Sequence, residues 1–269
     1  MIEIPFAPDL VLGPVRLAWH SIFSFLGLLV GSYVSIRCAR YLVKDERVYP
    51  FALAVVVGGL VSARAGHIID NWATYEGDVG RMLSLADGGI AVTAAAIGSS
   101  IGGLAAAKAL RLPLGFMFDV SVIGIALGLA IGRIGDIVNG EHWAAACSGL
   151  PWCVRYTHPE TLGQAHSVHP VVAYDLVWNL VIFAVTLAFW RRVRGRPPEG
   201  RVYWLHLVLY GGGRLVSSSL RLDPIVLAGW QEAQIIGVGY VLAGVPMLIW
   251  LELRARRRAG RAGASLHRR

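Results

Sequence analysis

Long apolar segments recur along this 269-residue chain, and they limit what it can fold into. A helix needs about 20 mostly apolar residues to cross the hydrocarbon core of a bilayer. Hydrophobic residues make up 55% of the chain and charged residues only 16%. We predict seven spans, at residues 16–36, 48–71, 88–107, 116–138, 170–190, 202–221 and 232–253. The sequence therefore predicts an all-α, polytopic membrane protein and excludes a water-soluble globule.

Lysine and arginine are distributed unevenly between the two sides of these spans. Positive residues are retained on the cytoplasmic side of a membrane. Of the 25 basic residues, 18 fall on one side, in the loops after spans one, three and five and in the tail 254–269. We therefore expect the amino terminus outside and the carboxyl terminus in the cytoplasm. The basic tail is interpreted as a topology anchor near anionic headgroups, with no role in nucleic-acid binding.

The chain 1–269 is expected to form a single integral-membrane domain, since no repeat or low-complexity segment divides it. Its long non-membrane segment is an outer loop at about 139–169. Cys147 and Cys153 share this loop, where the compartment permits a disulfide, but two free thiols fit the sequence nearly as well. The cysteines and the loop histidines match no common metal spacing, so we predict no metal and no cofactor.

Small residues at four-residue spacing occur in the third and fourth spans. They are Gly98 with Gly102, and Gly124 with Gly128 and Gly132. Such glycines let neighbouring helices approach closely in a membrane, so we interpret them as packing positions.

Three arginines interrupt the apolar spans. Arg64, Arg133 and Arg214 fall in spans two, four and six. An arginine at the bilayer centre costs roughly 2.5–3.5 kcal/mol, so it usually faces a cavity, a partner or an anionic ligand. All three spans run from inside to outside, and each arginine lies past the midpoint. We therefore expect the three side chains to gather in the outer half of the membrane around an anionic ligand.

A polar segment follows Arg133 at the outer end of its span, with Asp136, Asn139 and Glu141. Arg133 and Asp136 share a helix face, so Asp136 could simply neutralise the arginine. The functional interpretation is a headgroup site in which Arg133 contacts a phosphate. Asn139 and Glu141 would then bind hydroxyls or adjust protonation. The residues themselves leave both interpretations open.

Several short motifs occur in a fixed order along the chain. They are Gly-Arg-Ile-Gly at 132–135, Asn-Gly-Glu at 139–141, His-Pro at 169–170, Tyr-Asp at 174–175, Tyr-Gly-Gly-Gly-Arg at 210–214 and a glutamine at 234. This ordered set resembles the bacterial prolipoprotein diacylglyceryl transferases from about residue 19 to 253. The whole set is far more specific than any single motif.

The resemblance implies a seven-helix enzyme of the bacterial plasma (inner) membrane. It would transfer diacylglyceryl from phosphatidylglycerol to the lipobox cysteine thiol in a prolipoprotein signal peptide, forming a thioether. Arg133 and Arg214 would clamp the phosphate, with Glu141 as a further catalytic residue. The implied substrate-binding residues are Asn139, Asp136, Arg64, His169, Tyr174 and Tyr210. The nucleophile belongs to the substrate peptide, so the chain's own cysteines are not expected to be catalytic.

Several positions depart from the family pattern, including alanines in place of two glycines after Thr93. Thr93 stands where the family has a histidine, and threonine cannot serve as a base near neutral pH. Asp136 replaces an asparagine, His20 a tyrosine and Ser218 a glutamate. Either another group accepts the thiol proton, or the activity is altered or lost. The candidate acceptors are Glu141, His142, Asp136 and His20.

Two alternative functions are compatible with the residues. A divergent paralogue could keep the fold and the lipid-binding arginines but modify another acceptor or only bind lipid, and Thr93 favours this alternative. A membrane transporter of an anionic solute would also place charges inside apolar helices. Against transport, the intramembrane charges lie on one side, whereas an alternating-access pathway needs polar groups from both sides.

Overall fold

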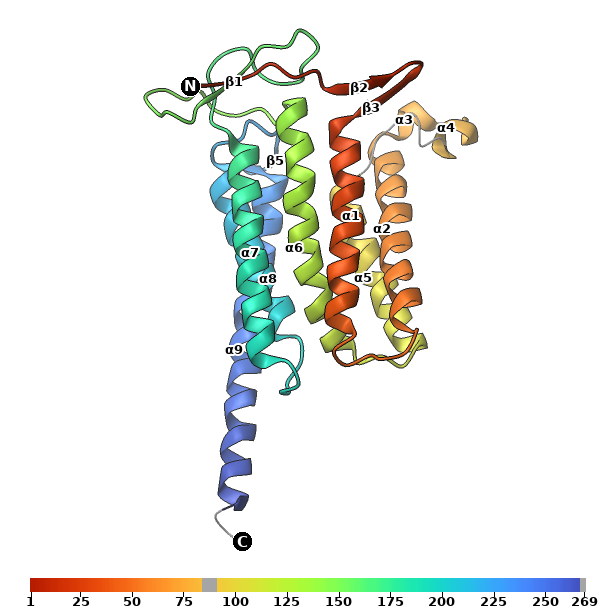
Figure 1. The fold of residues 1–269 in the computed structure, drawn as a ribbon, viewed down its shortest axis with the longest axis vertical. Helices are drawn as coiled ribbons and strands as arrows, with labels where there is room; N and C mark the ends of the chain where they lie inside the picture. Colours follow the sequence, from red (N-terminus) through yellow and green to blue (C-terminus); the bar gives the residue numbers. More distant parts are fainter. Residues whose placement is uncertain (84–90, 267–269) are drawn as a thin grey trace. The chain divides into compact units, whose positions relative to one another are not determined.

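A computed structural model describes residues 1–83 and 91–266, and most of them are helical (Figure 1). The long helices are α1 (Trp19–Ala39), α2 (Val48–Asp70), α5 (Val92–Ala109), α6 (Leu114–Asn139), α7 (Val171–Val193), α8 (Arg201–Ser218) and α9 (Glu232–Leu266). The short helices are α3 (Trp72–Tyr75) and α4 (Val79–Leu83). The chain forms two compact units, one of Met1–Ser35 with Asp119–Arg269 and one of Ile36–Phe118.

Five helices among the described residues are long and apolar enough to cross a membrane: α1, α2, α6, α7 and α9. The prediction of a helical, multi-pass membrane protein is therefore confirmed. Each predicted span overlaps a long helix, although residues 88–90 of the third span lie outside the described part of the chain. The count of seven spans and the orientation stay predictions. In α8, two arginines and a histidine lower the apolar character of the helix.

In the first unit, glycines bring α1 and α6 into backbone contact. A Cβ atom added at Gly124 would lie 2.0 Å from the carbonyl oxygen of Gly31, and one at Gly128 would lie 2.7 Å from that of Gly27. Both distances are far shorter than van der Waals contact, so only glycine fits at these positions. The predicted packing role of Gly124 and Gly128 is confirmed.

In the second unit, α2 and α5 pack on each other in the same way. Cβ atoms at Gly98 and Gly102 would lie 2.2 Å and 2.4 Å from the carbonyl oxygens of Gly58 and Ala54. The predicted packing role of Gly98 and Gly102 is confirmed as well. The side chain of Arg47 links the two helices again by donating to the Leu110 carbonyl at 2.9 Å.

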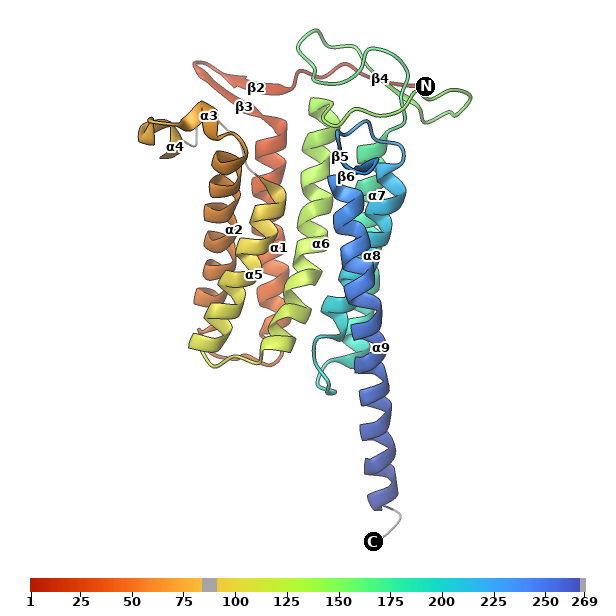
Figure 2. The same cartoon turned by 180° about the vertical axis from the view of Figure 1, so that it is seen from behind.

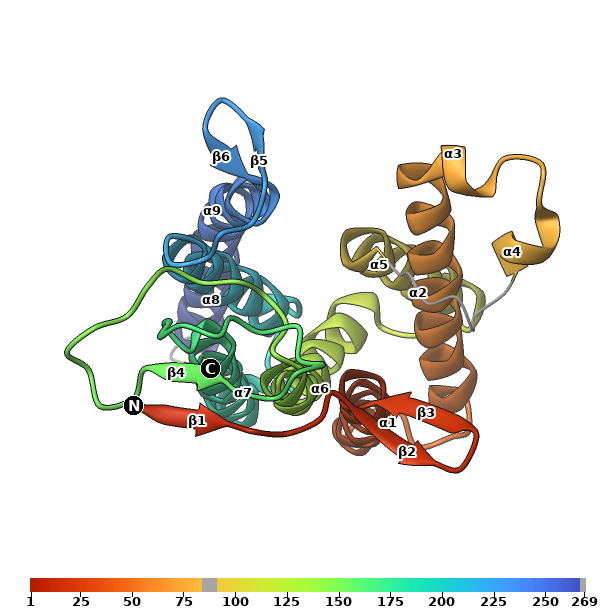
Figure 3. The ribbon, with the colours of Figure 1, turned by 90° about the horizontal axis from the view of Figure 1, so that it is seen from above.

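Short strands surround the end of the first unit where α6 ends and α7 begins (Figures 1 and 3). The strand β1 (Ile2–Ile4) pairs in parallel with β4 (Val154–Tyr156), which lies in the loop between α6 and α7. The hairpins are β2 (Asp9–Leu12) with β3 (Val15–Ala18), and β5 (Ile225–Leu227) with β6 (Trp230–Gln231) (Figure 2). The buried apolar cluster beneath β1 and β4 consists of Ile4, Ala144, Val154, Tyr156, Val168, Val171 and Val172. The loop predicted at 139–169 is thus an ordered layer that shares an apolar core with β1 and the start of α7.

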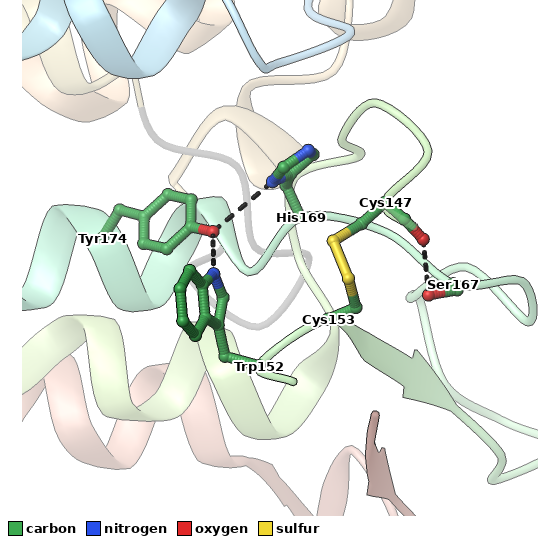
Figure 4. The surroundings of a disulfide bond; sticks show 6 residues. All are labelled: Cys147, Trp152, Cys153, Ser167, His169 and Tyr174. Atoms are coloured by element: carbon green, nitrogen blue, oxygen red, sulfur yellow. Dashed lines mark hydrogen bonds between the residues drawn. A yellow bond between two sulfur atoms is a disulfide. The ribbon is translucent and has the colours of Figure 1, made fainter. Parts of the chain in front are cut away.

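A disulfide between Cys147 and Cys153 closes part of this loop, with the two Cα atoms 5.7 Å apart (Figure 4). The sequence left this pairing open, and the structure decides it. The Ser167 hydroxyl donates to the Cys147 carbonyl at 2.9 Å, so the segment before α7 is attached to the same turn. A covalent link in this loop limits the motion of the residues that cover the end of α6.

We expect Gly124→Ala to lower the free energy of unfolding by about 1–3 kcal/mol, because the new methyl group would force α1 away from α6. Thermal unfolding of the purified protein in detergent measures the effect. Gly239→Ala is the matched control, since this glycine is exposed in α9 and nothing lies within 4 Å of an added Cβ. Equal melting temperatures for Gly124→Ala and the control would contradict the packing role.

Candidate active site

The carboxylate of Asp136 holds two side chains from different helices. Asp136 is buried near the end of α6, and its Oδ2 accepts from Arg133 Nη1 at 2.6 Å, one turn earlier in the helix. This ion pair confirms that the two residues share a face. The other oxygen, Oδ1, contacts Nδ1 of His20, which lies in the first turn of α1. One carboxylate therefore connects an arginine and a histidine that are remote in sequence.

The turn after α6 places Glu141 beside this group. Gly140 has a φ of +78°, and the amides of Gly140 and Glu141 both donate to the Asp136 carbonyl, at 3.0 Å and 3.1 Å. Asn139 Nδ2 donates to Glu141 Oε1 at 3.3 Å, while Glu141 Oε2 lies 3.5 Å from Nδ1 of His20. Burial raises the pKa of Glu141, with the nearby charge of Asp136 adding to it. The Asn-Gly-Glu motif thus forms a tight turn that returns a carboxyl group to the end of α6.

A second arginine group lies at the end of α8. Arg214 Nη1 donates to Oδ2 of Asp175 in α7 at 3.2 Å. Arg221 is buried and lies 3.7 Å from the same oxygen and 3.7 Å from Asp223. Two of its guanidinium nitrogens, Nε and Nη2, have no hydrogen-bond acceptor among the described residues. Burial lowers the pKa of Arg221, and the positive charge of Arg214 lowers it further.

His142 lies between the two arginine groups. Its Nε2 is 3.2 Å from Arg133 Nη1, and an arginine can only donate, so this nitrogen is the acceptor. Part of the side chain is accessible to solvent, yet desolvation and the charges of Arg221 and Arg133 lower the pKa of His142 to about 3. The charge of Arg214 acts in the same direction. The charges of Arg133, Arg214 and Arg221 thus all disfavour protonation of this imidazole.

A small pocket opens next to this site, with a volume of about 50 Å³. Glu141, His142, Gln164 and His169 contribute polar groups to its lining, together with apolar residues of the loop core. The hydroxyl of Tyr174 accepts from Trp152 Nε1 at 3.0 Å and lies 3.4 Å from Nδ1 of His169 (Figure 4). The predicted residues His169 and Tyr174 are thus hydrogen-bonded to each other beside the pocket.

Other predicted site residues have partners elsewhere. Tyr210 stacks on His206 one turn earlier in α8, with ring centroids 6.1 Å apart. Arg64 belongs to the second unit, where its guanidinium donates to the carbonyls of Arg81 and Met82 at 2.7 Å and 3.0 Å. Its prediction as a third basic contact for the ligand stays a prediction. Thr93 is exposed near the start of α5, and the Gly88-Gly89 pair before it lies outside the described residues.

The ligand-type atoms of His20, Asp136 and Glu141 lie within 4.8 Å of one another, which is close enough to surround a cation. The histidine nitrogen directed at this point is Nδ1, and it is the atom that contacts Asp136. A nitrogen that donates a hydrogen bond has no lone pair for a metal. We therefore treat the three residues as a hydrogen-bonded group.

The sequence did not identify Asp175 and Arg221 as site residues. Asp175 belonged to a recognised motif, directly after Tyr174, but its function as the counter-ion of Arg214 depends on the packing of α7 against α8. Arg221 was detectable as one of the few basic residues on the non-cytoplasmic side of the predicted topology. Its position at the end of a predicted span gave no reason to place it in the site.

The fold and site define a class of protein: a helical membrane protein with partly buried arginines, buried carboxylates and histidines gathered at one end of its helices. Comparison with known proteins identifies the family. The family described as prolipoprotein diacylglyceryl transferase matches residues 8–250. The chain belongs to this family.

Relatives named phosphatidylglycerol–prolipoprotein diacylglyceryl transferase align over most of the chain. The protein from Trichormus variabilis is 29% identical over 256 residues, which cover 91% of this chain and 89% of the relative. The protein from Clostridioides difficile is 28% identical over 238 residues, covering 88% and 92%. The protein from Streptococcus uberis is 26% identical over 240 residues, again covering 88% and 92%.

We expect His142→Asn to make the protein less sensitive to acid. The pKa of His142 is about 3 in the folded chain and about 6.5 in an unfolded one. Below pH 6.5 the unfolded chain binds a proton that the folded chain does not, so stability falls as the pH drops toward 3. Asparagine removes this proton site and tolerates the φ of +67° found here.

Melting temperatures of wild type and His142→Asn between pH 7 and pH 4.5 measure this effect. The wild type should lose more stability over the range than the variant does. Parallel curves would show that the imidazole does not carry the acid dependence assigned to it.

Proposed function

We propose that this protein transfers the diacylglyceryl group of phosphatidylglycerol to the lipobox cysteine thiol of prolipoproteins. The observation that carries the proposal is the pair of arginines held by buried carboxylates. Arg133 on Asp136 and Arg214 on Asp175 lie at the two arginine positions of the family motifs. In the proposal each arginine donates to the phosphate from its own helix, Arg133 from α6 and Arg214 from α8.

In the proposed reaction, negative charge develops on the phosphate that the arginines would bind. The substrate thiolate attacks the glycerol carbon that carries the phosphate ester, a thioether forms, and glycerol phosphate leaves. Negative charge builds on the departing phosphate oxygen as the carbon–oxygen bond breaks. Fixed guanidinium groups in a site with little water stabilise that charge without reorganising, and the planar fork of arginine matches two phosphate oxygens.

The remaining site residues have supporting functions in this proposal. Glu141, held by Asn139, would contact hydroxyl groups of the headgroup, and its raised pKa lets it exchange a proton. His169, which lines the pocket, its partner Tyr174, and Tyr210 of α8 would contact the substrate. Arg64 would add a third basic contact. The acceptor segment would be the signal peptide of a prolipoprotein, entering from the surrounding lipid.

The finer topology is also proposed from the sequence. Seven spans would place the amino terminus outside and the basic tail in the cytoplasm, in the inner membrane of a bacterium. The end of α6, with its disulfide loop, would then face the non-cytoplasmic side, where disulfides persist. The disulfide and the charge bias of the loops independently support this orientation.

Mass spectrometry of a lipobox peptide tests the function directly. The peptide is incubated with purified protein and phosphatidylglycerol in nanodiscs, and a peptide with serine in place of the cysteine serves as control. A diacylglyceryl mass gain on the cysteine peptide alone supports the transferase. No gain, with a family member that carries the usual histidine active in parallel, would overturn it in favour of a divergent paralogue.

We expect Arg133→Ala and Arg214→Ala each to reduce the transfer rate by about 10²–10³-fold, the range for loss of one charge-stabilising donor. Arg133→Lys and Arg214→Lys should recover only part of the loss, since lysine keeps the charge but lacks the fork. Arg254→Ala in the basic tail is the matched control and should keep the wild-type rate. Full activity of both alanine variants, folded by their melting temperatures, would exclude the phosphate clamp.

A further inference from the structure

Two departures from the family pattern meet in the structure. His20 replaces a tyrosine and Asp136 replaces an asparagine, and the two side chains are 116 positions apart in sequence. Nδ1 of His20 contacts Oδ1 of Asp136. Asp136 already has Arg133 as a partner for Oδ2, and His20 engages its other oxygen. Together His20 and Asp136 form a histidine–carboxylate pair.

A general base must be accessible to substrate, whereas the group that orients it can be buried, and the two partners differ in this way. The Asp136 side chain is 4% exposed and the His20 side chain 35% exposed. Since Nδ1 is engaged by the carboxylate, the ring nitrogen that can accept a proton from a substrate is Nε2. A buried carboxylate that holds Nδ1 fixes the tautomer, orients the ring and stabilises the imidazolium that forms when Nε2 is protonated.

The backbone of the two helices is shaped for this contact. Gly135 lies directly before Asp136, and a Cβ atom there would be 2.5 Å from the Trp19 carbonyl oxygen and 2.7 Å from the Cα of His20. Without a side chain at 135, the start of α1 rests on the end of α6. The second glycine of the Gly-Arg-Ile-Gly motif thus brings His20 within reach of Asp136.

The same carboxylate also holds the proposed phosphate ligand. Oδ2 of Asp136 pairs with Arg133 while Oδ1 contacts His20, so the base and the arginine are fixed relative to each other. The charged groups that face His20 are Asp136 and Arg133 from α6 and Glu141 from the following turn. Asp136 and Glu141 are acidic, so they stabilise the positive charge that forms when Nε2 takes a proton, whereas Arg133 opposes it. His20 could therefore accept the thiol proton while Arg133, held by the same carboxylate, stabilises the charge on the phosphate.

We infer that His20, positioned by Asp136, is the general base that takes the proton from the substrate thiol. This inference rests on the proposed transferase function. In the step, the S–H proton moves to Nε2 of His20 and the sulfur forms a bond to the glycerol carbon. The carbon–oxygen bond to phosphate breaks, its electron pair stays on the phosphate oxygen, and glycerol phosphate leaves. The imidazolium then returns its proton to water.

The other candidate bases are engaged differently. His142 uses Nε2 to accept from Arg133, and its pKa of about 3 makes it a poor proton acceptor. Both oxygens of Asp136 are engaged, Oδ2 by Arg133 and Oδ1 by His20. Glu141 accepts from Asn139 through one oxygen and faces His20 through the other. Among these groups, His20 combines an accessible nitrogen with a buried orienting partner.

The test is the pH dependence of transfer to a lipobox peptide by His20→Asn. The amide nitrogen of asparagine can replace Nδ1 as donor to Asp136, so the variant keeps the structural link but has no base. We expect kcat at pH 7 to fall by about 10²–10⁴-fold, the range for loss of a general base, while KM for phosphatidylglycerol stays the same. The defect should shrink toward pH 9, because the peptide thiol, with a pKa of about 8.5, then ionises by itself.

His158→Asn in the outer loop is the matched control and should keep the wild-type rate and pH profile. A second variant, His20→Gly, should regain activity when imidazole is added to the buffer. A loss in His20→Asn that is equal at all pH values would show a purely structural role and overturn the inference. Wild-type activity in His20→Asn would also overturn it while leaving the transferase function intact. An inactive wild type would overturn both.

Discussion

The site depends on the contacts that the Asp136 carboxylate makes with Arg133 and His20. Asp136 neutralises Arg133 on its own helix and holds His20 of α1, and its backbone carbonyl accepts the two amides of the turn that carries Glu141. A buried carboxylate without partners would be protonated or would destabilise the helix end. With Arg133 and His20 as partners it fixes these two side chains relative to each other. Loss of this carboxylate would therefore disturb the base and the arginine together, while the backbone carbonyl would still hold the turn.

Glycine makes this arrangement possible over the length of the helices. Gly27 and Gly31 of α1 face Gly124 and Gly128 of α6, and Gly135 continues the contact to the helix end. In a membrane, apolar side chains gain little by leaving lipid for protein, so close backbone packing has to supply much of the association energy. The glycines of the motif thus have a packing function first. The site at the helix end is positioned by that packing.

The sequence predicted those parts of the molecule that depend on local chemistry. Apolar length located the helices, and the three-residue spacing of Arg133 and Asp136 gave their ion pair. The contacts that join distant segments had no comparable signal. His20 with Asp136 and Arg214 with Asp175 depend on which helices pack together. The family pattern marked His20 and Asp136 as departures, but only the structure shows that they are partners.

The cost of placing arginines in apolar helices explains why the site has paired charges. Arg133 and Arg214 each need a counter-ion before a ligand arrives, and Asp136 and Asp175 supply one from the same or a neighbouring helix. Arg221 shares Asp175, and two of its guanidinium nitrogens have no acceptor in the part of the chain that the structure describes. A buried donor without an acceptor costs about 1–3 kcal/mol, and an anionic headgroup that supplies the acceptor would recover it. The carboxylates neutralise the arginines and so lower the cost of placing them in apolar helices. The unsatisfied donors of Arg221 would favour the binding of a phosphate.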